Sequence, residues 1–396
     1  MINKNKRIII INGIIITPFQ LICGKAIIVE KEKIIAIINK EELNTATLTG
    51  VEVIEANDKF VVPGYIDIHI HGGGGSDVMD GNYEAINQIA ITHSHFGTTA
   101  FLPTTMTMSK NRIIRSLRSI GEAVEKGTTG AKILGVHLEG PYINPEKKGA
   151  QKEEDIKEIS IEEFLEFNQA SGNLIRLVTI APEIPGAVDF IRWLNKQGII
   201  TSAGHSNATY MQIEEGIQAG LSQVTHLFNA MKGLHHREPG IIGAALASPE
   251  LTVEVIADGI HVHPMVIKIV IEIKGDERVV LVTDAIRATG INEGIYDLGG
   301  QKITVKQGQA RLKTGVLAGS VLTMDKAVKN LVTKVGIPLT KAIKMASFNP
   351  AKCIGIDDRK GSLAVNKDAD IVILNKNLET ELTMVAGRVV YRRKEI

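Results

Sequence analysis

The feature that most constrains the fold is an alternation of short apolar segments and helical stretches between residues 63 and 355. Eight of the apolar segments have the length of a strand, and helical stretches separate most of them. This alternation is typical of a (β/α)8 barrel, in which helices surround a ring of parallel strands. The eight expected strands are Tyr65–Ile70, Thr99–Leu102, Ile133–Leu138, Leu177–Ile180, Ile200–Ala203, Gln223–Thr225, Thr252–Ile256 and Val279–Val282.

The two ends of the chain have a different pattern. Short β-branched segments, separated by turn residues, occupy the first 60 or so residues and return after residue 370. A chain whose two ends are both β-structure can pair them in one small unit and insert the middle as another. We therefore expect an α/β protein with a barrel of residues 63–355 and a small β-sandwich of residues 1–62 and 356–396. A hairpin is expected within the barrel at Tyr296–Arg311.

The composition excludes several classes of partner. The chain has 396 residues and a net charge of +1, so charge gives no reason to expect nucleic acid. The apolar run Ile8–Ile16 is interrupted by Asn12 and lacks a cleavage site, and no segment has the roughly 18 apolar residues of a spanning helix. Two cysteines, Cys23 and Cys353, cannot form a disulfide framework. We expect a cytoplasmic protein that binds neither nucleic acid nor membrane.

Histidines and carboxylates stand directly after the expected strands. Catalytic groups in a (β/α)8 barrel come from the carboxyl ends of the strands, so this placement tests the barrel prediction. Six of the eight strands are followed at once by such a group, which scattered core histidines would not do. The groups are His69 and His71, His137 and Glu139, His205, His226, Asp258 and His261, and Asp284.

Three of these residues predict a metal site. Glu139 precedes Gly140-Pro141, which ends its strand, and His205 and His226 each end an apolar strand. A helix cap or solvated charge is the alternative for Glu139, and a buried structural role is the alternative for each histidine. Together the three supply a nitrogen and oxygen donor set that leaves positions for water, as in catalytic metal sites. Zn²⁺, Fe²⁺, Mn²⁺ and Co²⁺ all accept such ligands.

Two further features extend the predicted site. His69 and His71 are two residues apart on a strand, so both imidazoles face the same way and can share a metal. The alternative is a pair of histidines that are hydrogen-bonded within the protein or exposed.

Asp284 follows the last strand. A carboxylate beside a metal-bound water can accept its proton and deliver it to a leaving amine. A helix cap is the alternative for Asp284, and the metal ligands upstream favour catalysis.

The loop 225–240 and the segment after the seventh strand offer substrate contacts. The planar guanidinium of Arg237 suits a phosphate or a carboxylate, although a surface salt bridge is the alternative. His261 and His263 repeat the two-residue spacing, but Pro264 follows them. We expect His261 to contact substrate and His263 to be structural.

Motifs over nearly the whole chain resemble those of the N-acetylglucosamine-6-phosphate deacetylase family. The most specific is Thr225–Met231 with His235–Gly240 after it. The pair His69 and His71 and the tail Asp368–Asp370 are shared by many amidohydrolases and indicate only the superfamily. The resemblance implies hydrolysis of N-acetyl-D-glucosamine 6-phosphate to D-glucosamine 6-phosphate and acetate, in amino-sugar catabolism and cell-wall sugar recycling. It also implies a homodimer or homotetramer.

The resemblance carries roles to individual residues. Glu139, His205 and His226 match the principal metal ligands, and Asp284 matches the general base and acid. We expect His137 to support the metal in stabilising the oxyanion. The substrate-binding positions implied are Ala150, Asn229, Ala230, Arg237, Asp258, His261, Leu317, Ala318 and Gly319.

The number of metal ions is left at one or two per subunit. Some family members lack the two histidines and use one metal, whereas this chain keeps His69 and His71. A second metal could be held by these two residues with Glu139 and Asp284. Many superfamily relatives use a bridging carboxylated lysine. No lysine stands at the end of an expected strand in this chain, and Glu139 would take the place of the bridging lysine.

Two other functions compete with the deacetylase. One is an amidohydrolase that opens a cyclic amide or deaminates a base, and Arg237 with Asn229 and Ala230 favours an anionic sugar instead. The other is a binding or regulatory protein that has lost catalysis. The complete set of expected ligands, together with Asp284, argues against this second alternative.

Overall fold

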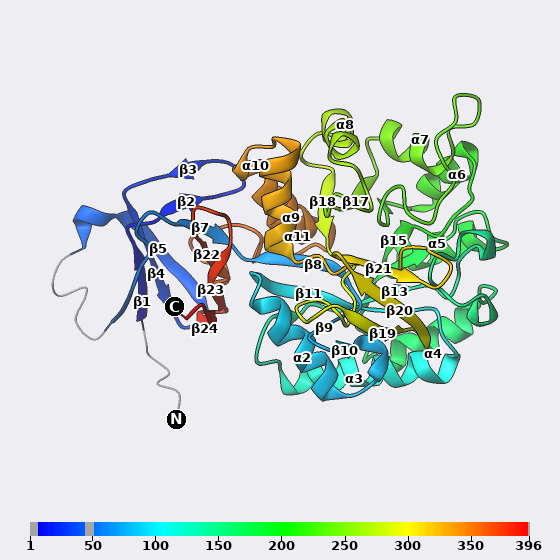
Figure 1. Cartoon of the computed structure of the whole chain (residues 1–396), viewed down its shortest axis with the longest axis horizontal. Coiled ribbons are helices and arrows are strands. Elements are labelled where there is room, and N and C mark those ends of the chain that lie inside the picture. Colours follow the sequence, from blue (N-terminus) through cyan, green and yellow to red (C-terminus); the bar gives the residue numbers. More distant parts are fainter. Residues whose placement is uncertain (1–6, 44–50, 395–396) are drawn as a thin grey trace.

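The computed structural model describes residues 7–43 and 51–394, which form a barrel and a smaller β-sandwich (Figure 1). Eight parallel strands follow one another around the barrel in sequence order. The ring closes just beyond the last strand, where Asp284 N donates to His69 O (2.9 Å) and Ile70 pairs with Ala285. The strands are β8 (Tyr65–Ile70), β11 (Thr98–Thr105), β13 (Val136–Glu139), β14 (Ile175–Ile180), β15 (Ile200–Ala203), β16 (Gln223–Val224), β17 (Thr252–Ile256) and β18 (Val279–Val282).

This arrangement confirms the expected (β/α)8 fold. Strands covered on both faces read as continuous apolar runs, and every residue of β8, β17 and β18 is buried. The third expected strand differs from its prediction because it is divided into β12 (Lys132–Ile133) and β13. Leu134 and Gly135 separate the two parts, and Gly135 has a φ of +145° that a regular strand does not adopt.

Seven helices connect consecutive strands of the barrel. Their first turns are capped by the preceding polar residue in several cases. Asn82, Ser160 and Thr209 accept hydrogen bonds from the backbone three residues later. The helices are α2 (Tyr83–Ser94), α3 (Lys110–Lys126), α4 (Ile161–Ala170), α5 (Ala187–Lys196), α6 (Tyr210–Ala219), α7 (Gly240–Ala247) and α8 (Pro264–Lys274).

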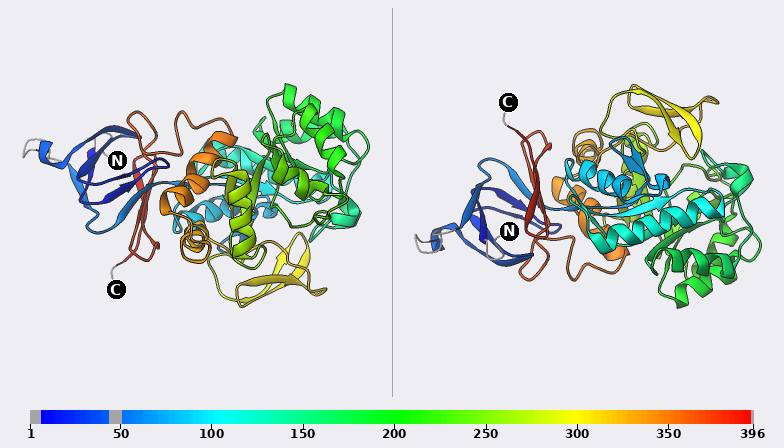
Figure 2. Two further views of the ribbon diagram at one scale, coloured as in Figure 1. Left: turned by 90° about the horizontal axis from the view of Figure 1, so that it is seen from above. Right: turned by 90° about the horizontal axis from the view of Figure 1, so that it is seen from below.

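The chain after β18 makes a small sheet before it returns to helices. The expected hairpin is a three-stranded antiparallel sheet of β19 (Gly294–Leu298), β20 (Gln301–Lys306) and β21 (Gln309–Leu312). Figure 2 shows this sheet at the side of the barrel, apart from the sandwich. The helices α9 (Met324–Asn330), α10 (Leu339–Ile343) and α11 (Asn349–Cys353) follow, with π-helical turns at Leu331–Val335 and Lys344–Phe348.

Both ends of the described chain build the β-sandwich, as expected. One sheet has the order β5-β4-β1-β6 and the other has the order β24-β23-β22-β7-β2-β3. Ile10 and Ile27 of the first sheet share a core with Ile371 and Met384 of the second. The strands are β1 (Arg7–Ile11), β2 (Ile14–Ile16), β3 (Leu21–Ile22), β4 (Lys25–Glu30), β5 (Lys33–Asn39), β6 (Glu52–Glu55), β7 (Phe60–Pro63), β22 (Ile371–Leu374), β23 (Thr380–Val385) and β24 (Arg388–Arg392).

The sandwich is joined to the barrel through β7, which pairs with β22 and runs through Gly64 into β8. The division at residues 62 and 355 stays a prediction. Among the described residues, no helix is both long and apolar enough to cross a lipid bilayer.

Candidate metal-dependent active site

A cavity of about 530 Å³ lies at the carboxyl ends of the barrel strands. It is lined by His71, Glu139, His205, His226 and Asp284, each of which stands at or just after the end of its strand. Active sites of (β/α)8 enzymes occupy this end of the barrel. The strand-end residues singled out by the sequence therefore meet in one place.

Glu139, His205 and His226 form the first donor set, as the sequence predicts. The Nε2 atoms of His205 and His226 lie 3.2 and 3.3 Å from Glu139 Oε1 and 3.1 Å from each other. Ligands about 2.1 Å from one ion lie about 3 Å apart at tetrahedral or octahedral angles. The three atoms are thus spaced like neighbouring ligands of one metal ion, and all three side chains are buried.

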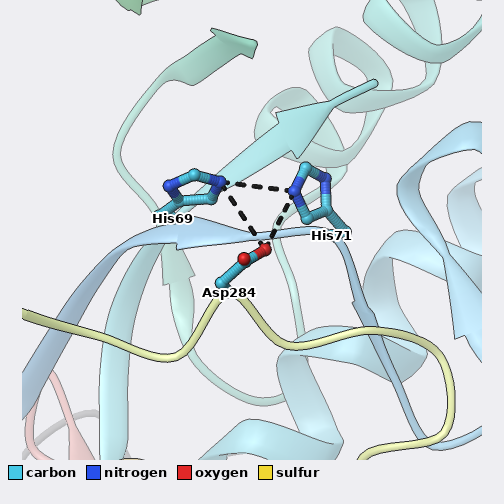
Figure 3. Close-up of side chains that lie close together, drawn as sticks. All are labelled: His69, His71 and Asp284. Atoms are coloured by element: carbon cyan, nitrogen blue, oxygen red, sulfur yellow. Dashed lines mark hydrogen bonds and ion pairs between the residues drawn. The ribbon is translucent and has the colours of Figure 1, made fainter. Parts of the chain in front are cut away.

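His69, His71 and Asp284 form the second donor set. Figure 3 shows the imidazole of His69 on β8, that of His71 directly after β8, and the carboxylate on the loop after β18, all directed toward one point. Asp284 Oδ1 lies 3.2 Å from His71 Nε2 and 3.7 Å from His69 Nε2, and the two imidazole nitrogens are 3.3 Å apart. These residues also fit a buried divalent ion.

The carboxylate of Glu139 connects the two sets. Its Oε1 atom is 3.3 Å from His69 Nε2, and its Oε2 atom is 3.4 Å from His71 Nε2. The same Oε1 faces His205 and His226. One carboxylate therefore lies between two adjacent donor sets, in the place where a bridging ligand would be needed.

The outer nitrogens of three histidines are held by hydrogen bonds. His69 Nδ1 lies 3.0 Å from Glu254 Oε2, His71 Nδ1 is 3.1 Å from Thr104 O, and His205 Nδ1 is 2.9 Å from Lys147 O. A proton on each Nδ1 leaves the lone pair of Nε2 directed at the centre of the site. The tautomer that a metal ligand requires is therefore set by the surrounding residues.

Two residues that hydrogen-bond to the donor residues were missed by the sequence analysis. Glu254 is in the middle of β17 and 1% exposed, and a carboxylate inside an apolar strand was the signal that could have revealed it. Gln151 Nε2 donates to Glu139 Oε2 (2.7 Å), and its Oε1 accepts a hydrogen bond from Thr107 N (2.9 Å). Gln151 lies in a loop, and nothing in its sequence surroundings indicates this contact.

The backbone is unusual at three of the metal-type residues. His205, His226 and Asp284 have φ values of +49°, +31° and +49°. Residues other than glycine seldom adopt this left-handed conformation, and where they do it often marks a functional site. Here it turns each side chain into the cavity directly after its strand ends.

The electrostatics of the two sets favour a bound cation. Burial alone would lower the pKa of His69, but Glu139, Glu254 and Asp284 raise it well above its ordinary value. Burial would raise the pKa of Glu139, yet His69 and hydrogen bonds from His205 and His226 hold it well below its usual range. The buried carboxylates are thus stabilised by nearby positive charge. In the metal-free protein this charge comes from protonated histidines, and a bound metal ion would replace it.

Most of the expected substrate-binding residues reach the cavity. Asp258 Oδ2 holds His261 Nδ1 at 2.6 Å, and this fixes the ring at the cavity wall. Ala318 is fully buried behind the wall rather than part of it. The lining includes Ala150, Asn229, Ala230, His261, Leu317 and Gly319.

Two of the expected site residues do not line the cavity of their own chain. His137 does not line the cavity, because its Nδ1 is 3.1 Å from Ile68 O and its Nε2 is 2.7 Å from Thr179 Oγ1. With both nitrogens engaged it can support His69, whose ring it contacts. The oxyanion role expected for it stays a prediction. Arg237 is exposed and bonded to His236 (2.9 Å), so it does not reach the cavity of its own chain.

A larger groove of about 910 Å³ lies in the sandwich, and several of its charged side chains are paired. Lys59 lies 2.6 Å from Glu381, and Arg393 lies 2.9 Å from Glu379. Among the described residues, two clusters of histidine and carboxylate side chains are suited to a metal ion, and both lie in the barrel. The barrel cavity is therefore the candidate active site.

Comparison with known proteins agrees with the fold. The amidohydrolase family matches residues 60–390, which include the whole barrel, and the chain belongs to this family. N-acetylglucosamine-6-phosphate deacetylase of Bacillus subtilis is 41% identical over 347 residues, 87% of this chain and 88% of that protein. N-acetylgalactosamine-6-phosphate deacetylase of Escherichia coli O157:H7 is 39% identical over 338 residues, 85% and 89% of the two chains.

A solved structure is similar over its full length. The crystal structure of N-acetylglucosamine-6-phosphate deacetylase from Pasteurella multocida matches with a TM-score of 0.92 and 33% identity. The match covers 98% of this chain and 100% of that one. The family resemblance expected from the sequence is thereby confirmed.

Proposed function

We propose that this protein is a metal-dependent deacetylase of N-acetyl-D-glucosamine 6-phosphate in amino-sugar catabolism. The observation that carries the proposal is the pair of donor sets joined by Glu139, with Asp284 beside them in the cavity. The names of the three relatives, all amino-sugar phosphate deacetylases, support the substrate class. Water adds to the acetyl carbon, the carbon–nitrogen bond breaks, and acetate and D-glucosamine 6-phosphate leave.

One or two divalent ions per chain would be held by the donor sets. Glu139, His205 and His226 would hold one, and His69, His71 and Asp284 would hold a second with Glu139 between them. Imidazole and carboxylate ligands suit Zn²⁺, Fe²⁺, Mn²⁺ and Co²⁺ alike. A bound ion of this kind polarises the substrate carbonyl and lowers the pKa of water.

Asp284 is the group that would move the protons. Burial would raise its pKa, but His69 and His71 lower it below its ordinary value, so the side chain is a carboxylate at neutral pH. It can therefore accept a proton from the attacking water and give it to the departing amine nitrogen. The position of Asp284 on the cavity wall allows both transfers from one side chain.

We further propose a homodimer or homotetramer in the cytoplasm, where phosphorylated sugars are retained. Met265, Ile269 and Ile273 of α8 are 56%, 49% and 55% exposed at four-residue spacing, and Leu234 is 60% exposed. A stripe of this kind is typical of a surface that a partner covers. Arg237 lies in the same loop as Leu234 and would then face the cavity of a neighbouring copy.

The test is a deacetylation assay combined with metal analysis of the purified protein. We expect acetate release from N-acetyl-D-glucosamine 6-phosphate that a chelator abolishes and added metal restores. The same assay on N-acetyl-D-galactosamine 6-phosphate decides between the two sugars named in the relatives. Chelator-resistant activity, or no hydrolysis of either sugar phosphate by the metal-loaded protein, would contradict the proposal.

A further inference from the structure

Arg287 was not singled out from the sequence, although it lies three residues after Asp284 in the loop that follows β18. The loop is irregular, and Asp284 has a left-handed φ of +49°. An irregular loop fixes a side chain only where contacts with other segments hold it in place. The side chain of Arg287 is 18% exposed, so most of it lies among such segments.

The guanidinium binds the hairpin that follows β8, which is built from β9 (Gly72–Gly73) and β10 (Ser76–Asp77). Arg287 Nη1 donates to Gly75 O (3.4 Å), and Gly75 N donates in return to Arg287 O (2.8 Å). Arg287 Nη2 lies 2.9 Å from Asp80 Oδ1, in the turn after the hairpin. The backbone and the side chain of Arg287 are thus both attached to this hairpin and its turn.

The hairpin also places a buried carboxylate near Arg287. The side chain of Asp77 is 1% exposed, and its Oδ2 atom has no hydrogen-bond partner within residues 7–43 and 51–394. Arg287 Nη2 lies 3.9 Å from this atom. A buried carboxylate is costly without a nearby positive charge, so the contact between Arg287 and the hairpin is electrostatic as well as hydrogen-bonded.

This hairpin begins directly after His71, a member of the second donor set. His71 N donates to the backbone oxygen of Ala285 (2.8 Å), the residue after Asp284. A Cβ added at Gly72 would lie 2.5 Å from Arg287 N, so the two backbones are in direct contact. Arg287 therefore holds the loop that carries Asp284 against the segment that carries His71.

The third partner of the guanidinium belongs to the small sheet β19–β21. Arg287 Nε donates to Asp297 O (2.7 Å), and the next residue, Leu298, lines the cavity. Gln301 Nε2, on β20, donates to Ala150 O (2.6 Å), and Ala150 lines the cavity as well. The small sheet is therefore attached to the cavity wall on one side and to the loop of Arg287 on the other.

We propose that Arg287 is a positioning residue that fixes the carboxylate of Asp284 relative to His71 and to the small sheet. This inference rests on the proposed function, in which Asp284 moves the protons. A guanidinium is planar and carries five N–H donors, so it can bond three segments in one conformation. Arg287 does not itself line the cavity, so it acts on the reaction through Asp284.

The experiment compares Arg287→Met and Arg287→Lys with the wild-type enzyme. The kcat for N-acetyl-D-glucosamine 6-phosphate should fall about 10- to 100-fold in Arg287→Met, because a small displacement of a catalytic group has an effect of this size. The KM should rise far less than kcat falls, because Arg287 does not line the cavity. Arg287→Lys keeps the charge and should recover part of the lost kcat, but not all of it, because an ammonium lacks the planar fork.

Hydrogen exchange measures the position of the loop without any substrate. The backbone amide of Asp284 donates to His69 O (2.9 Å), and that of Gly75 donates to Arg287 O (2.8 Å). In metal-loaded Arg287→Met both amides should exchange faster than in the wild-type protein, because the loop opens more often. The amides of β14, which is three strands away from β8, should exchange at the wild-type rate.

Arg115→Met is the matched control. Arg115 is an exposed residue of α3 whose Nε donates to Gly81 O (3.2 Å), directly after Asp80, and its loss should leave kcat and exchange unchanged. Asp80→Asn weakens one contact of Arg287 without a change of size and should lower kcat less than Arg287→Met does. In the double variant the two losses should not multiply, because Asp80 acts through Arg287. Metal content and thermal stability are measured in every variant.

The outcomes separate this inference from the proposed function. If the wild-type enzyme hydrolyses the sugar phosphate but folded Arg287→Met resembles Arg115→Met, the inference is wrong and the function stands. The inference is equally wrong if KM changes in place of kcat, or if exchange at Asp284 stays at the wild-type rate. Should Arg287→Met not fold, Arg287→Lys and Asp80→Asn decide by the same measurements. If the metal-loaded wild-type protein does not hydrolyse the sugar phosphate, the proposed function fails, and hydrogen exchange still tests whether Arg287 holds the loop.

Discussion

His69 Nδ1 lies 3.0 Å from a carboxylate oxygen of Glu254, a buried residue in the middle of β17. The same oxygen accepts a hydrogen bond from the backbone nitrogen of His226 (3.2 Å). Glu254 therefore holds the ring of a residue in one donor set and the backbone of a residue in the other. Such a carboxylate orients a histidine ligand and increases its basicity.

We expect Glu254→Leu to lose the metal ion of the His69, His71 and Asp284 set. The wild-type protein should bind two ions per chain, and affinity for one of them should fall about 10- to 100-fold when the supporting carboxylate is removed. Elemental analysis after dialysis against graded metal concentrations measures this. Glu254→Gln keeps an acceptor for Nδ1 and should retain more metal. A Glu254→Leu protein that still holds both ions would show that Glu254 does not position the site.

The contrast between Glu139 and Glu254 shows which site residues can be predicted from the sequence and which cannot. Residues directly after strands could be predicted as site residues, because parallel strands bring their carboxyl ends to one edge of the barrel. That rule located both donor sets, of which Asp284 is a member. It gives no information on Glu254 within a strand, or on Gln151, whose position depends on how its loop folds over the cavity.

Two predicted site residues, His137 and Arg237, do not line the cavity of their own chain, for physical reasons. His137 precedes Glu139 by two residues and was expected to act with it, but hydrogen bonds to Ile68 O and Thr179 engage both of its nitrogens. Arg237 follows Asn229 and Ala230 in one motif, yet a bridge between His235 and Glu238 turns the chain back at the surface. A motif indicates which residues act together but not where the fold places each side chain.

Asp284→Asn should reduce turnover by about two to four orders of magnitude, because the amide cannot accept the proton of the attacking water. The first donor set does not include Asp284, so the ion at Glu139, His205 and His226 should remain. Steady-state kinetics and metal analysis of one preparation test both statements. Activity close to that of the wild-type enzyme would rule out proton transfer by Asp284.

Metal binding should release protons at neutral pH. His69 and His71 both have a raised pKa in the metal-free protein, so each keeps its proton to a higher pH than an ordinary histidine, whose pKa is 6.5. A metal ion must displace these protons. The apparent affinity should therefore fall as the pH decreases through the raised pKa values and rise as the pH increases.

Calorimetry in buffers of different ionisation enthalpy measures the number of protons released on metal binding. His137 provides an internal contrast, because burial holds its pKa well below 6.5 and it should stay neutral throughout. Metal binding without proton release near pH 7, which is about half a unit above the ordinary histidine value, would contradict the proposed electrostatics.

Gly319→Ala should disturb the loop that carries Asp284. Gly319 has a φ of +58°, and an added Cβ would lie 2.4 Å from Ile286 Cγ2 and 3.1 Å from Asp284 O. The left-handed backbone costs about 1–2 kcal/mol for a residue with a Cβ, and the clash adds to it. Gly315→Ala is the control, because its φ is +86° but no atom lies within 4 Å. Urea unfolding and kcat should separate the two variants, and equal effects would mean that the clash is relieved without moving Asp284.

Lys360 should be essential to the junction between the barrel and the sandwich. It is 1% exposed, lies 3.0 Å from Asp368 Oδ2, and also bonds Asp370. The backbone oxygen of Asp370 accepts a hydrogen bond from Gly64, the residue between β7 and β8. Burial would lower the pKa of Lys360, but Asp370 and Asp368 raise it, so the side chain remains charged.

Lys360→Met leaves two carboxylates without their buried cation, and removal of one partner of a buried ion pair costs about 3–5 kcal/mol. Lys33→Met is the matched control, because Lys33 binds the other oxygen of Asp368 (2.7 Å) from an exposed position and such pairs contribute about 0–1 kcal/mol. The free energy of unfolding in urea should therefore fall steeply only in Lys360→Met. Equal losses in the two variants would indicate that Asp368 and Asp370 are satisfied by water or by Lys33, and that burial of Lys360 does not stabilise the junction.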